Sequence, residues 1–442
     1  MTPPWYRAAW ALARPFAPLA ASGGGKFARS VAGRLGAADA IVGWAAAHRD
    51  RARPLVWLHA ASVGEGRQAE AVLRLLRAAR PRWQFLFTHS SPSAERLAAA
   101  LPADFAGYVP FDTVGETGRA LAAARPDLLC FAATDVWPEL AHQAALRGIL
   151  TALVSANLAA ASSRLGAVAR ALLGPAYAEL DLVGAIDQGD AERFVALGVP
   201  PGRVVVTGDT RHDAARERAD ALDRRAPHLA ALAGGAGIAP VVVAGSTWPS
   251  DDARLLPALG ALRRAGIPFR LVAAPHEPTP PHLRTLTAAI TAAFGAGVEL
   301  TTLSVLEERA RGGGAPPRWE VCVVDRVGVL ADLYAAAALA YVGGGFHRHG
   351  LHSVIEPAAL GVGVLFGPRW RMSRDARLLL DAGGGASAAD ARGLETLLRA
   401  WLTDDAARAT AGAAARAVVD RGLGAAERSV SLLLELLARP SV

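Results

Sequence analysis

The sequence predicts an α/β protein with two doubly wound domains, each built on a mostly parallel sheet. Three observations lead to this prediction. From residue 55 onward, short apolar runs alternate with helical patterns, which is typical of a parallel sheet covered on both faces. A charged, alanine-rich stretch over residues 209–237 interrupts the alternation, and a second series of the same kind follows it. The length of 442 residues also exceeds what one hydrophobic core usually serves.

The first series contains the predicted strands of the first domain. Each is a short apolar run followed by a helix or by a turn into one, and together they cover residues 55–60, 83–88, 107–110, 127–132, 150–155, 182–186 and 204–207. Between the first two runs, residues 66–80 have apolar side chains at the i, i+3, i+4, i+7 spacing of one helix face. These side chains are Ala69, Val72, Leu73 and Leu76. This helix is therefore predicted to lay an apolar stripe on the sheet.

The second series contains the predicted strands of the second domain, separated again by helical stretches. They cover residues 241–244, 269–273, 321–324, 339–342 and 362–366. Residues 288–317, which include a run of three glycines, are the least regular part and are predicted to form a loop flanking the third strand. From residue 386 onward the chain is predicted to be helical and amphipathic.

These patterns predict three regions along the chain. An N-terminal segment covers residues 1–50, a first sheet domain covers 51–215, and a second covers 216–442 with the C-terminal helices. The two sheet domains are expected to face each other across a cleft. Ligands of doubly wound sheets bind at the carboxyl ends of the strands. The candidate site residues are therefore those that follow the predicted strands.

Composition excludes some classes of function. Hydrophobic residues make up 52% and charged residues 20%, which excludes a disordered chain. The net charge of +7 favours an anionic partner, such as lipid or substrate. The excess is spread over many arginines with no basic block, so nucleic acid is disfavoured. The two cysteines, Cys130 and Cys322, lie far apart in apolar runs and predict a reducing compartment rather than a disulfide framework.

The N-terminus is apolar and aromatic but is predicted neither to span a membrane nor to be a cleaved signal. Arginines and prolines interrupt residues 5–21 well before the ~20 apolar residues that a spanning helix needs. The segment instead resembles one lying in a membrane interface, with rings at headgroup depth and cations on phosphates. The residues concerned are Trp5, Tyr6, Arg7, Trp10, Arg14, Phe16, Lys26, Arg29 and Arg34. The alternative is a helix packed on the protein.

A glycine-rich turn follows the predicted strand over residues 339–342. Gly343, Gly344 and Gly345 allow backbone N–H groups to approach a ligand that a Cβ would block. A helix is predicted to start at Ser353, because Ser353 and Glu356 have capping-box spacing. A strand, a glycine turn and a helix start with a carboxylate together indicate a nucleotide-sugar site.

A second candidate turn follows the first predicted strand. Glu65 lies in it as the only carboxylate at that strand end, where a general base is expected. Gly64 allows a ligand to approach closely. Ser62 and Glu65 also have capping-box spacing, so the alternative is that Glu65 only caps its own helix.

Other candidates each have a competing interpretation. His347, His349 and His352 form a His-x-His-x-x-His pattern that metal sites use, but solvated or phosphate-facing histidines are favoured. Ser91 either touches a substrate or caps a helix, and the cap is favoured. Arg211, together with Asp213, either reaches a donor substrate or solvates the connection between the domains. Trp137 and Pro138 are predicted to pack the domain rather than to bind sugar.

Several segments together resemble the 3-deoxy-D-manno-octulosonic acid (Kdo) transferases, in order and in spacing. They are residues 57–65, 137–138, 206–211, 244–247, 274–277 and 343–356. The resemblance covers nearly the whole chain, from the aromatic N-terminus through residue 368, and is far more specific than one glycine loop. It implies a GT-B glycosyltransferase with two Rossmann-like domains. It further implies inverting transfer of Kdo from CMP-Kdo to a lipid A precursor (lipid IVA) in lipopolysaccharide biosynthesis, no metal or other cofactor, and attachment to anionic lipids on the cytoplasmic face of the inner membrane.

The resemblance also implies roles for individual residues. Glu65 matches the general base that deprotonates the acceptor hydroxyl, and Ser246 and Thr247 match a phosphate-facing turn. Glu356 matches a carboxylate that holds ribose hydroxyls. The other positions expected on the donor side are Pro275, His276, Gly344, Gly345, His352, Ser353 and Arg211. The positions expected toward the acceptor or the cleft are Ser62, Gly64, Ser91 and Asp135.

The chain departs from the family pattern at three places. Many members have Glu-x-Glu before Trp-Pro, whereas here Ala133 replaces the first carboxylate and only Asp135 remains. Ser353 stands where many members have asparagine, and Pro275 stands where some have arginine. The alternatives are a catalytically weak lipid-A-binding paralogue or a GT-B enzyme for another nucleotide sugar. The joint presence of Glu65, His276 and Glu356 favours an active enzyme.

Overall fold

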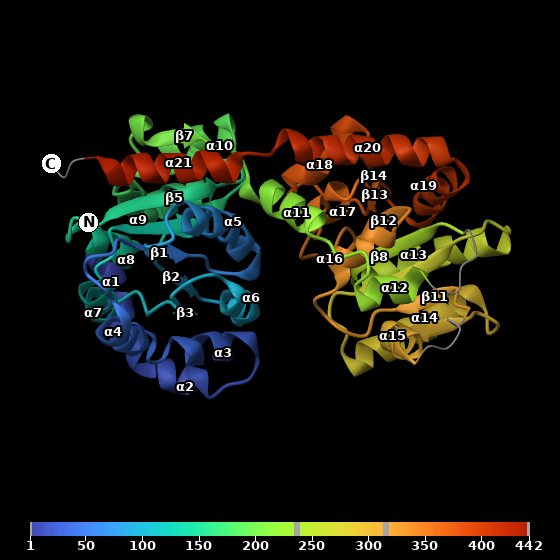
Figure 1. The fold of residues 1–442 in the computed structure, drawn as a ribbon, viewed down its shortest axis with the longest axis horizontal. Helices are drawn as coiled ribbons and strands as arrows, with labels where there is room; N and C mark the ends of the chain where they lie inside the picture. The colour runs from blue at the N-terminus through green and yellow to red at the C-terminus, as the bar shows by residue number, and fades with distance from the viewer. Residues whose placement is uncertain (1, 234–238, 313–317, 440–442) are drawn as a thin grey trace. The chain divides into compact units, whose positions relative to one another are not determined.

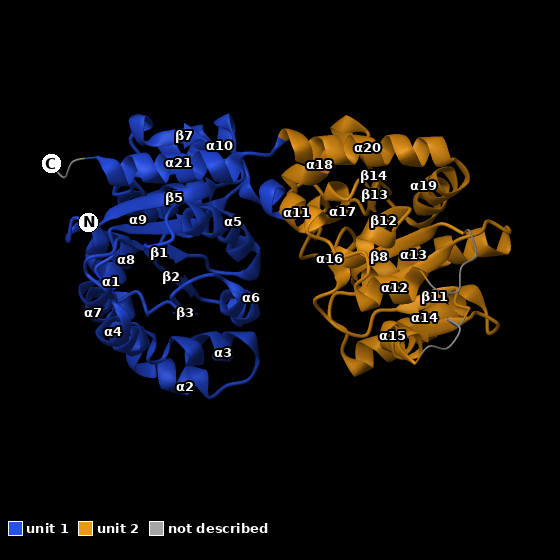
Figure 2. Ribbon diagram, in the orientation of Figure 1, with its two compact units in different colours: residues 1–214, 422–442 blue, residues 215–421 orange. Residues whose placement is uncertain are grey.

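The computed structural model describes residues 2–233, 239–312 and 318–439. The chain forms two compact units (Figure 2). Unit 1 contains residues 1–214 and 422–442, and unit 2 contains residues 215–421. The predicted boundary at residue 215 lies where unit 1 gives way to unit 2, but the C-terminal residues from 422 onward return to unit 1.

Unit 1 is built on a seven-stranded sheet whose strand pairs are all parallel (Figure 1). The order is β3-β2-β1-β4-β5-β6-β7, so the topological switch point lies between β1 and β4. The strands are β1 (Leu55–His59), β2 (Gln84–His89), β3 (Phe105–Tyr108), β4 (Leu128–Ala132), β5 (Leu150–Ala156), β6 (Leu182–Ala185) and β7 (Val204–Val206). The first predicted series of strands is confirmed, with ends that differ by a residue or two.

Helices cover both faces of this sheet. The helices of unit 1 are α1 (Pro4–Ala13), α2 (Ala17–Ala21), α3 (Gly25–Arg34), α4 (Ala37–His48), α5 (Val63–Ala79), α6 (Glu95–Ala100), α7 (Val114–Ala124), α8 (Pro138–Ala145), α9 (Ala167–Ala178), α10 (Gln188–Ala196) and α21 (Ala425–Ala438), with α11 (Thr210–Asp220) running from unit 1 into unit 2. Short 3₁₀ turns are η1 (Arg14–Phe16), η2 (Pro92–Ala94), η3 (Ser163–Leu165) and η4 (Pro201–Arg203). Successive residues of a strand are buried on opposite faces of the sheet. Trp57 and Leu129 join one core with Ile41 of α4, whereas Val56 joins another with Leu73 of α5.

Unit 2 repeats the design with a second seven-stranded parallel sheet, in the order β10-β11-β9-β8-β12-β13-β14. Its strands are β8 (Val241–Thr247), β9 (Arg270–Pro275), β10 (Leu300–Thr302), β11 (Val321–Val323), β12 (Leu339–Val342), β13 (Val364–Phe366) and β14 (Gly385–Ser387). Its helices are α12 (Pro227–Ala233), α13 (Pro249–Arg264), α14 (Pro280–Phe294), α15 (Leu303–Arg311), α16 (Leu330–Leu333), α17 (Ile355–Ala359), α18 (Arg374–Ala382), α19 (Ala391–Thr403) and α20 (Asp405–Arg421), with the 3₁₀ turn η5 (Tyr334–Ala336). The switch point lies between β8 and β12.

The expectation of a loop over residues 288–317 is wrong for most of that range. Helix α14 continues to Phe294, whose ring is buried with Ile290, and β10 and α15 follow. Leu303 and Leu306 of α15 are buried in the other core of unit 2. Residues 313–317, which hold most of the glycine run, lie outside the described part of the chain. The strands β10 and β14 were not predicted, because each has only three residues and lies at a sheet edge.

Helix α21 differs most from its predicted place. It packs against α5 and buries Val430, Leu433 and Leu436 in the core of unit 1. Asp213 caps its start by accepting hydrogen bonds from the N–H groups of Gly424 and Ala426, at 2.7 and 2.9 Å. The amphipathic pattern predicted the helix but carried no information on which sheet it covers.

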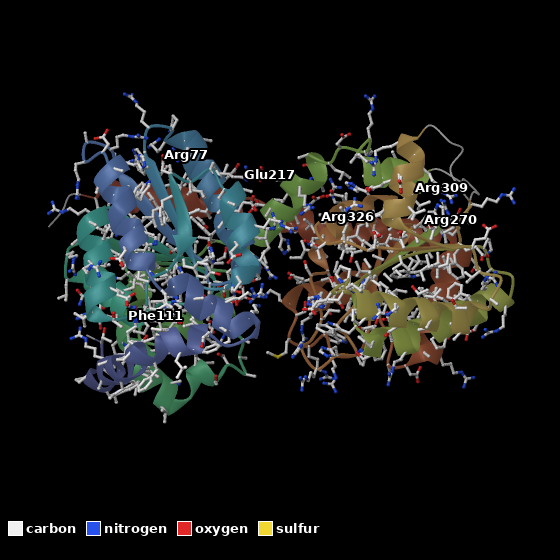
Figure 3. All side chains as sticks on the ribbon, turned by 90° about the horizontal axis from the view of Figure 1, so that it is seen from below. Arg77, Phe111, Glu217, Arg270, Arg309 and Arg326 are labelled. Atoms are coloured by element: carbon white, nitrogen blue, oxygen red, sulfur yellow. The ribbon has the colours of Figure 1, made fainter. Side chains whose placement is uncertain are left out.

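Several N-terminal side chains expected at a membrane interface point into the protein instead. The Tyr6 hydroxyl donates to Asp112, and Arg7 donates to the buried Glu139 at 2.8 and 3.0 Å. Arg34 is buried and donates to the carbonyls of Val109 and Pro110. The rings and guanidinium groups of this region gather on Phe111, which is labelled in Figure 3: Trp10 lies 5.8 Å from it, and Arg14 and Arg34 lie over its ring.

Other N-terminal side chains are exposed, and Trp5, Phe16, Lys26 and Arg29 among them were expected at the interface. Trp5, Leu12, Phe16, Leu19 and Phe27 are between 53% and 73% exposed. Lys26 and Arg29 are exposed beside Phe27. In the part of the chain that the structure describes, no helix combines the length and the apolar composition needed to cross a bilayer.

Candidate functional site

In unit 1, the carboxyl end of β1 leads into the turn that carries Glu65. Ser62 and Glu65 form the predicted capping box of α5: the Ser62 hydroxyl accepts from the N–H of Glu65, and the Ser62 N–H donates to Glu65 Oε2 at 3.1 Å. The capping box is therefore present, which does not decide whether Glu65 also acts as a base. It leaves the second carboxylate oxygen, Oε1, outside the capping box. Nothing crowds Gly64, whose added Cβ would meet only Ser62 Oγ at 3.9 Å, so local packing does not require glycine there.

The electrostatics of Glu65 suit proton transfer. Burial raises the pKa of its carboxyl to about 7, the nearby charge of Asp135 adds to the rise, and the N–H groups of Ala61 and Ser62 oppose it. Asp135 is itself paired with Arg164 of η3. Arg164 lies far along the chain and belongs to no motif, so the sequence did not point to it.

Trp137 packs the domain, as predicted. Its indole N–H donates to His59 Nε2 at 2.8 Å, and His59 Nδ1 lies 3.0 Å from the Thr88 hydroxyl. Burial, with Arg34 nearby, lowers the pKa of His59 to about 3, so the ring is neutral. Arg34 lies 4.4 Å over the Trp137 ring. Hydrogen bonds and ring contacts thus hold these side chains together near the ends of β1 and β4.

The remaining unit 1 candidates have structural partners. Ser91 caps η2, because its Oγ accepts from the N–H of Ser93 at 3.3 Å. Arg211 pairs with the buried Asp209, with Nε to Oδ2 at 2.9 Å. Ala133, the position of the missing family carboxylate, has a left-handed φ of 65° and a buried side chain. A longer side chain would have to enter the protein interior there.

In unit 2, a buried aspartate that was not among the predicted site residues organises the glycine turn. Asp251 lies in the first turn of α13 and is fully buried. Its Oδ2 accepts from the N–H groups of Trp248 and Gly344, at 3.0 and 2.9 Å. Its Oδ1 accepts from the Tyr341 hydroxyl at 2.9 Å and from the N–H of Phe346 at 3.2 Å. One carboxylate thus ties the end of β8 to the turn after β12.

The glycines were expected to offer free N–H groups to the donor, but they instead allow close contacts within the chain. The N–H of Gly344, expected to bind the donor, is taken up by Asp251. Gly344 has a φ of +91°, and an added Cβ would lie 2.1 Å from the carbonyl oxygen of Gly350. A Cβ on Gly345 would lie 2.4 Å from the backbone of Gly367. Close contacts within the chain, rather than room for a ligand alone, require glycine at these two positions.

The predicted helix start at Ser353 is wrong. Helix α17 begins at Ile355 with Val354 as its N-cap, no side chain caps it, and Ser353 is exposed. The backbone N–H of His352 donates to the carbonyl of Gly343 at 3.1 Å, which keeps the chain in the preceding loop. A helix of only five residues has few aligned peptide dipoles with which to attract an anion.

Four histidines gather around Trp248, which follows Ser246 and Thr247 at the end of β8. The Trp248 ring is stacked with His347 at 4.2 Å and with His276 at 4.5 Å, and His349 meets it edge-on at 5.8 Å. Its indole N–H donates to His352 Nε2 at 3.0 Å. Burial lowers the pKa of His276 below its usual range and that of His352 to about 4. Both are neutral rings at physiological pH.

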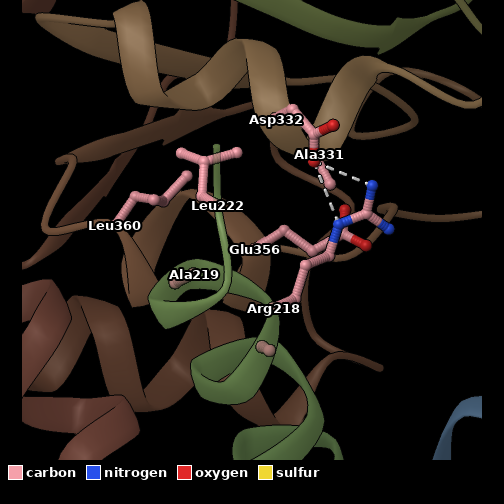
Figure 4. Close-up of a pocket in the computed structure, with 8 residues that line it drawn as sticks. Arg218, Ala219, Leu222, Ala331, Asp332, Glu356 and Leu360 are labelled. Carbon is pink, nitrogen blue, oxygen red and sulfur yellow. Dashed lines mark hydrogen bonds and ion pairs between the residues drawn. The ribbon is translucent and has the colours of Figure 1, made fainter. Parts of the chain in front are cut away.

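The other donor-side candidates lie at the same strand ends. Ser246 sits in a bulge between β8 and β9 with a φ of 53°, and Thr247 and Pro275 are buried. The carbonyl of Thr247 accepts from the N–H of His276 at 2.9 Å. Glu356 is half-buried and lines a narrow pocket with Arg218 and Asp332, which bind each other (Figure 4).

Proteins of similar sequence agree with the family resemblance that the sequence motifs indicated. Residues 30–214 match the family described as 3-Deoxy-D-manno-octulosonic-acid transferase (kdotransferase). The chain is 32% identical over 394 residues to the 3-deoxy-D-manno-octulosonic acid transferase of Bordetella pertussis, covering 86% of this chain and 87% of that protein. It is 27% identical over 392 residues to the same-named protein of Haemophilus influenzae, covering 87% of each.

Solved structures share the fold at low sequence identity. A UDP-N-acetylglucosamine 2-epimerase superposes with a TM-score of 0.59 and 16% identity, covering 88% of this chain and 98% of that one. MurG of Acinetobacter baumannii superposes with a TM-score of 0.54 and 15% identity, covering 86% and 99%. These matches concern the fold alone, and they confirm the predicted GT-B class with two parallel-sheet units.

Proposed function

Because the chain belongs to the 3-deoxy-D-manno-octulosonic acid (Kdo) transferase family, it transfers Kdo from CMP-Kdo in lipopolysaccharide biosynthesis, and we propose that its acceptor is a lipid A precursor such as lipid IVA. Glu65 is the general base of this reaction. The observation that carries the proposal is the raised pKa of about 7 for Glu65, in a turn at the switch point of the first sheet.

The proposed step is a single displacement at the anomeric carbon of Kdo. Glu65 takes the proton of the acceptor hydroxyl, the hydroxyl oxygen forms the new bond to the anomeric carbon, and the bond from that carbon to the phosphate oxygen breaks. The electron pair of that bond leaves with CMP. A single displacement inverts the configuration. A carboxylate with a pKa near 7 is a stronger base than an ordinary glutamate and is still ionised in part at neutral pH.

A transfer assay with radiolabelled CMP-Kdo and lipid IVA tests this function. Label is expected to move into the lipid, and the anomeric configuration of the product is expected to be inverted. Absence of transfer to lipid IVA, with transfer to another acceptor, would reject the acceptor that we propose.

Hydrogen bonds within the histidine cluster of unit 2 support donor binding without a metal. Two of the nitrogen atoms that the His-x-His-x-x-His pattern offers a metal are occupied: His352 Nε2 accepts from Trp248, and His347 Nδ1 accepts from the N–H of His349 at 3.4 Å. Hydrogen-bond donors at the donor site, rather than an ion, would then stabilise the phosphate as it departs. Ser246 and His276 are the side chains proposed for this role.

Transfer activity is therefore expected to survive excess EDTA. Fixed hydrogen-bond donors supply the stabilisation that a divalent ion would otherwise give. The measurement compares initial rates with and without chelator at constant ionic strength. A loss of activity that Mg²⁺ or Zn²⁺ restores would contradict the metal-free mechanism.

Glu356 is proposed to hold the ribose hydroxyls of the donor. Replacing Glu356 by alanine is expected to weaken CMP binding by about 1–3 kcal/mol, because a hydrogen bond to a charged acceptor is lost. Calorimetry with CMP measures the change, and Glu395→Ala on α19, whose carboxylate pairs with the half-exposed Arg399, is the matched control. An affinity equal to that of the wild-type protein would remove Glu356 from the site.

We further propose that the exposed N-terminal side chains bind the anionic surface of the inner membrane. Leu12, Phe16 and Leu19 recur at helical spacing and are all strongly exposed. Such an apolar stripe, with Lys26 and Arg29 exposed nearby, fits the boundary between headgroups and acyl chains. Peripheral association would bring the enzyme to its lipid acceptor.

The variant Leu12→Glu/Phe16→Glu/Leu19→Glu is expected to lose binding to anionic vesicles and to transfer Kdo slowly to a vesicle-embedded acceptor. A detergent-solubilised acceptor should be used almost normally. Vesicle binding of the wild type should also weaken with salt, since each Lys or Arg near the surface contributes about 1 kcal/mol and is screened. Sedimentation with vesicles measures both effects.

The control is Val168→Glu on α9, which is 84% exposed outside this segment. Substitution is preferable to deletion of residues 1–22, because deletion would leave the buried Glu139 without Arg7. Equal sedimentation of the triple variant and the control would place the membrane contact elsewhere.

A further inference from the structure

Trp248 has an indole N–H that can only donate, and this decides the state of His352. The bond from Trp248 Nε1 to His352 Nε2 is 3.0 Å long, so Nε2 is the acceptor and carries no proton. In a neutral imidazole the proton then resides on Nδ1. Among the residues that the structure describes, no side chain or backbone group accepts a hydrogen bond from this Nδ1–H. His352 therefore presents one oriented donor that the protein does not use.

The position of Trp248 is itself fixed from several sides. Its backbone N–H donates to Asp251 Oδ2, the same oxygen that accepts from Gly344. Its ring is stacked with His347, with an interplanar angle of only 7°. Pro249 follows as the first residue of α13 and restricts the backbone. The indole N–H is thus aimed by the same buried carboxylate that shapes the glycine turn.

The imidazole of His352 is equally constrained. Its backbone N–H donates to the carbonyl of Gly343 at 3.1 Å, and its ring is stacked with His276 at 4.5 Å. The ring planes of Trp248 and His352 lie within 13° of each other, which is compatible with a hydrogen bond close to the plane of both rings. Rotation of the ring by half a turn would place Cε1, which accepts no hydrogen bond, at the indole N–H in place of Nε2 and destroy the arrangement.

We propose that Trp248 is a positioning residue of the donor site, which holds His352 in its Nδ1–H tautomer so that this N–H donates to an anionic oxygen of CMP-Kdo. This inference rests on the proposed function of unit 2 as the donor-binding unit. CMP-Kdo carries two anionic groups, the phosphate and the Kdo carboxylate. The shared chemistry is an oxygen anion, and the binding measurements below separate the two sources.

The test compares Trp248→Phe, which keeps an aromatic ring and removes the N–H, with Trp401→Phe, the same change in a partly buried tryptophan of α19. The ¹⁵N resonances of His352 in the full-length, ligand-free protein report the tautomer, and His352→Asn identifies them. The wild type is expected to show a protonated Nδ1 and an unprotonated Nε2. Trp248→Phe is expected to show a mixture of tautomers, and Trp401→Phe is expected to match the wild type.

Binding identifies the anion. Trp248→Phe is expected to weaken binding by about 3- to 10-fold, as for partial loss of one hydrogen bond to a charged acceptor. Weaker binding of both CMP and CMP-Kdo assigns the bond to the phosphate, and weaker binding of CMP-Kdo alone assigns it to the carboxylate. Unchanged binding of both ligands, or an unchanged tautomer in Trp248→Phe, would overturn the proposal.

A pair of His352 variants keeps the test decisive if Trp248→Phe does not fold. The amide nitrogen of asparagine lies where Nδ1 lies, and that of glutamine lies where Nε2 lies. His352→Asn is therefore expected to bind the donor better than His352→Gln, and the reverse order would reject the assignment. A wild-type protein that binds neither ligand would instead reject unit 2 as the donor-binding unit, whatever the tautomer of His352.

Discussion

Glu65→Gln is expected to lower kcat by about 10²-fold or more while leaving CMP binding unchanged, as for loss of a general base. Glutamine keeps the size of the side chain, and its amide oxygen still accepts from the N–H of Ser62, so the capping box and α5 should survive. Circular dichroism and calorimetry with CMP establish that the variant folds and binds. The transfer assay then isolates the proton transfer.

The pH dependence of the wild-type enzyme provides a second readout for Glu65. A carboxyl with a raised pKa is ionised only above that pKa, so the basic form is present above pH 7 and is lost as the pH falls through about 7. Turnover should therefore decline on the acidic side with a midpoint near 7, and Glu65→Gln should lack this limb. A folded Glu65→Gln protein with near wild-type transfer would reduce Glu65 to a helix cap.

Asp251→Ala is expected to lower the free energy of unfolding by about 3 kcal/mol or more, because each buried donor left unpaired costs roughly 1–3 kcal/mol. Four donors lose their acceptor: the N–H groups of Trp248, Gly344 and Phe346, and the Tyr341 hydroxyl. Urea unfolding of the full-length protein measures the loss. Hydrogen exchange should accelerate at Gly344 and Phe346, and CMP binding should fall as the turn opens.

The neighbouring Asp252 is the matched control. Burial, with Asp251 adjacent, raises its pKa to about 7 from 3.8. A raised folded-state pKa means that the folded protein binds the proton more tightly, so this contribution to stability is full below about pH 4, declines as the pH rises from there, and is gone above about 7. Asp252→Asn should therefore match the wild type near pH 4, where the carboxyl is protonated in both states, and equal or exceed it at pH 8. If Asp251→Ala proved no less stable than Asp252→Asn, the four hydrogen bonds would have no special weight.

The sequence predicted the central strands because they are continuous apolar runs buried on both faces. Residues 55–59 and 339–342 are buried throughout, and no polar alternation obscures them. The edge strands β10 and β14 escaped prediction, since three residues cannot establish a pattern. Phe294 and Leu303 show the converse case, in which burial orders a stretch whose glycines suggested a loop.

Local signals in the sequence failed where distant residues compete for the same groups. Ser353 and Glu356 have the spacing of a capping box, yet the bond from His352 to Gly343 holds the chain away from helical geometry at Ser353. The three glycines indicated free N–H groups, but Asp251, ninety-three residues earlier than Gly344, accepts one of them. Arg7 and Arg34 were predicted to bind membrane phosphates. They bind Glu139 and the carbonyl of Val109 instead, which lie far along the chain. None of these pairings has a local sequence signature.

The return of α21 to unit 1 affects the order in which the protein can mature on the ribosome. Residues 55–206, which hold every strand of the first sheet, leave the ribosome before unit 2 is made, yet the helix that covers part of that sheet is made after all of unit 2. Val154 and Leu182 share a core with Val430 and Leu433, so this apolar surface stays uncovered while some two hundred further residues are synthesised. Unit 1 is thus the first to leave the ribosome and the last to complete its core. Chaperones are therefore expected to bind nascent chains that are stalled within unit 2.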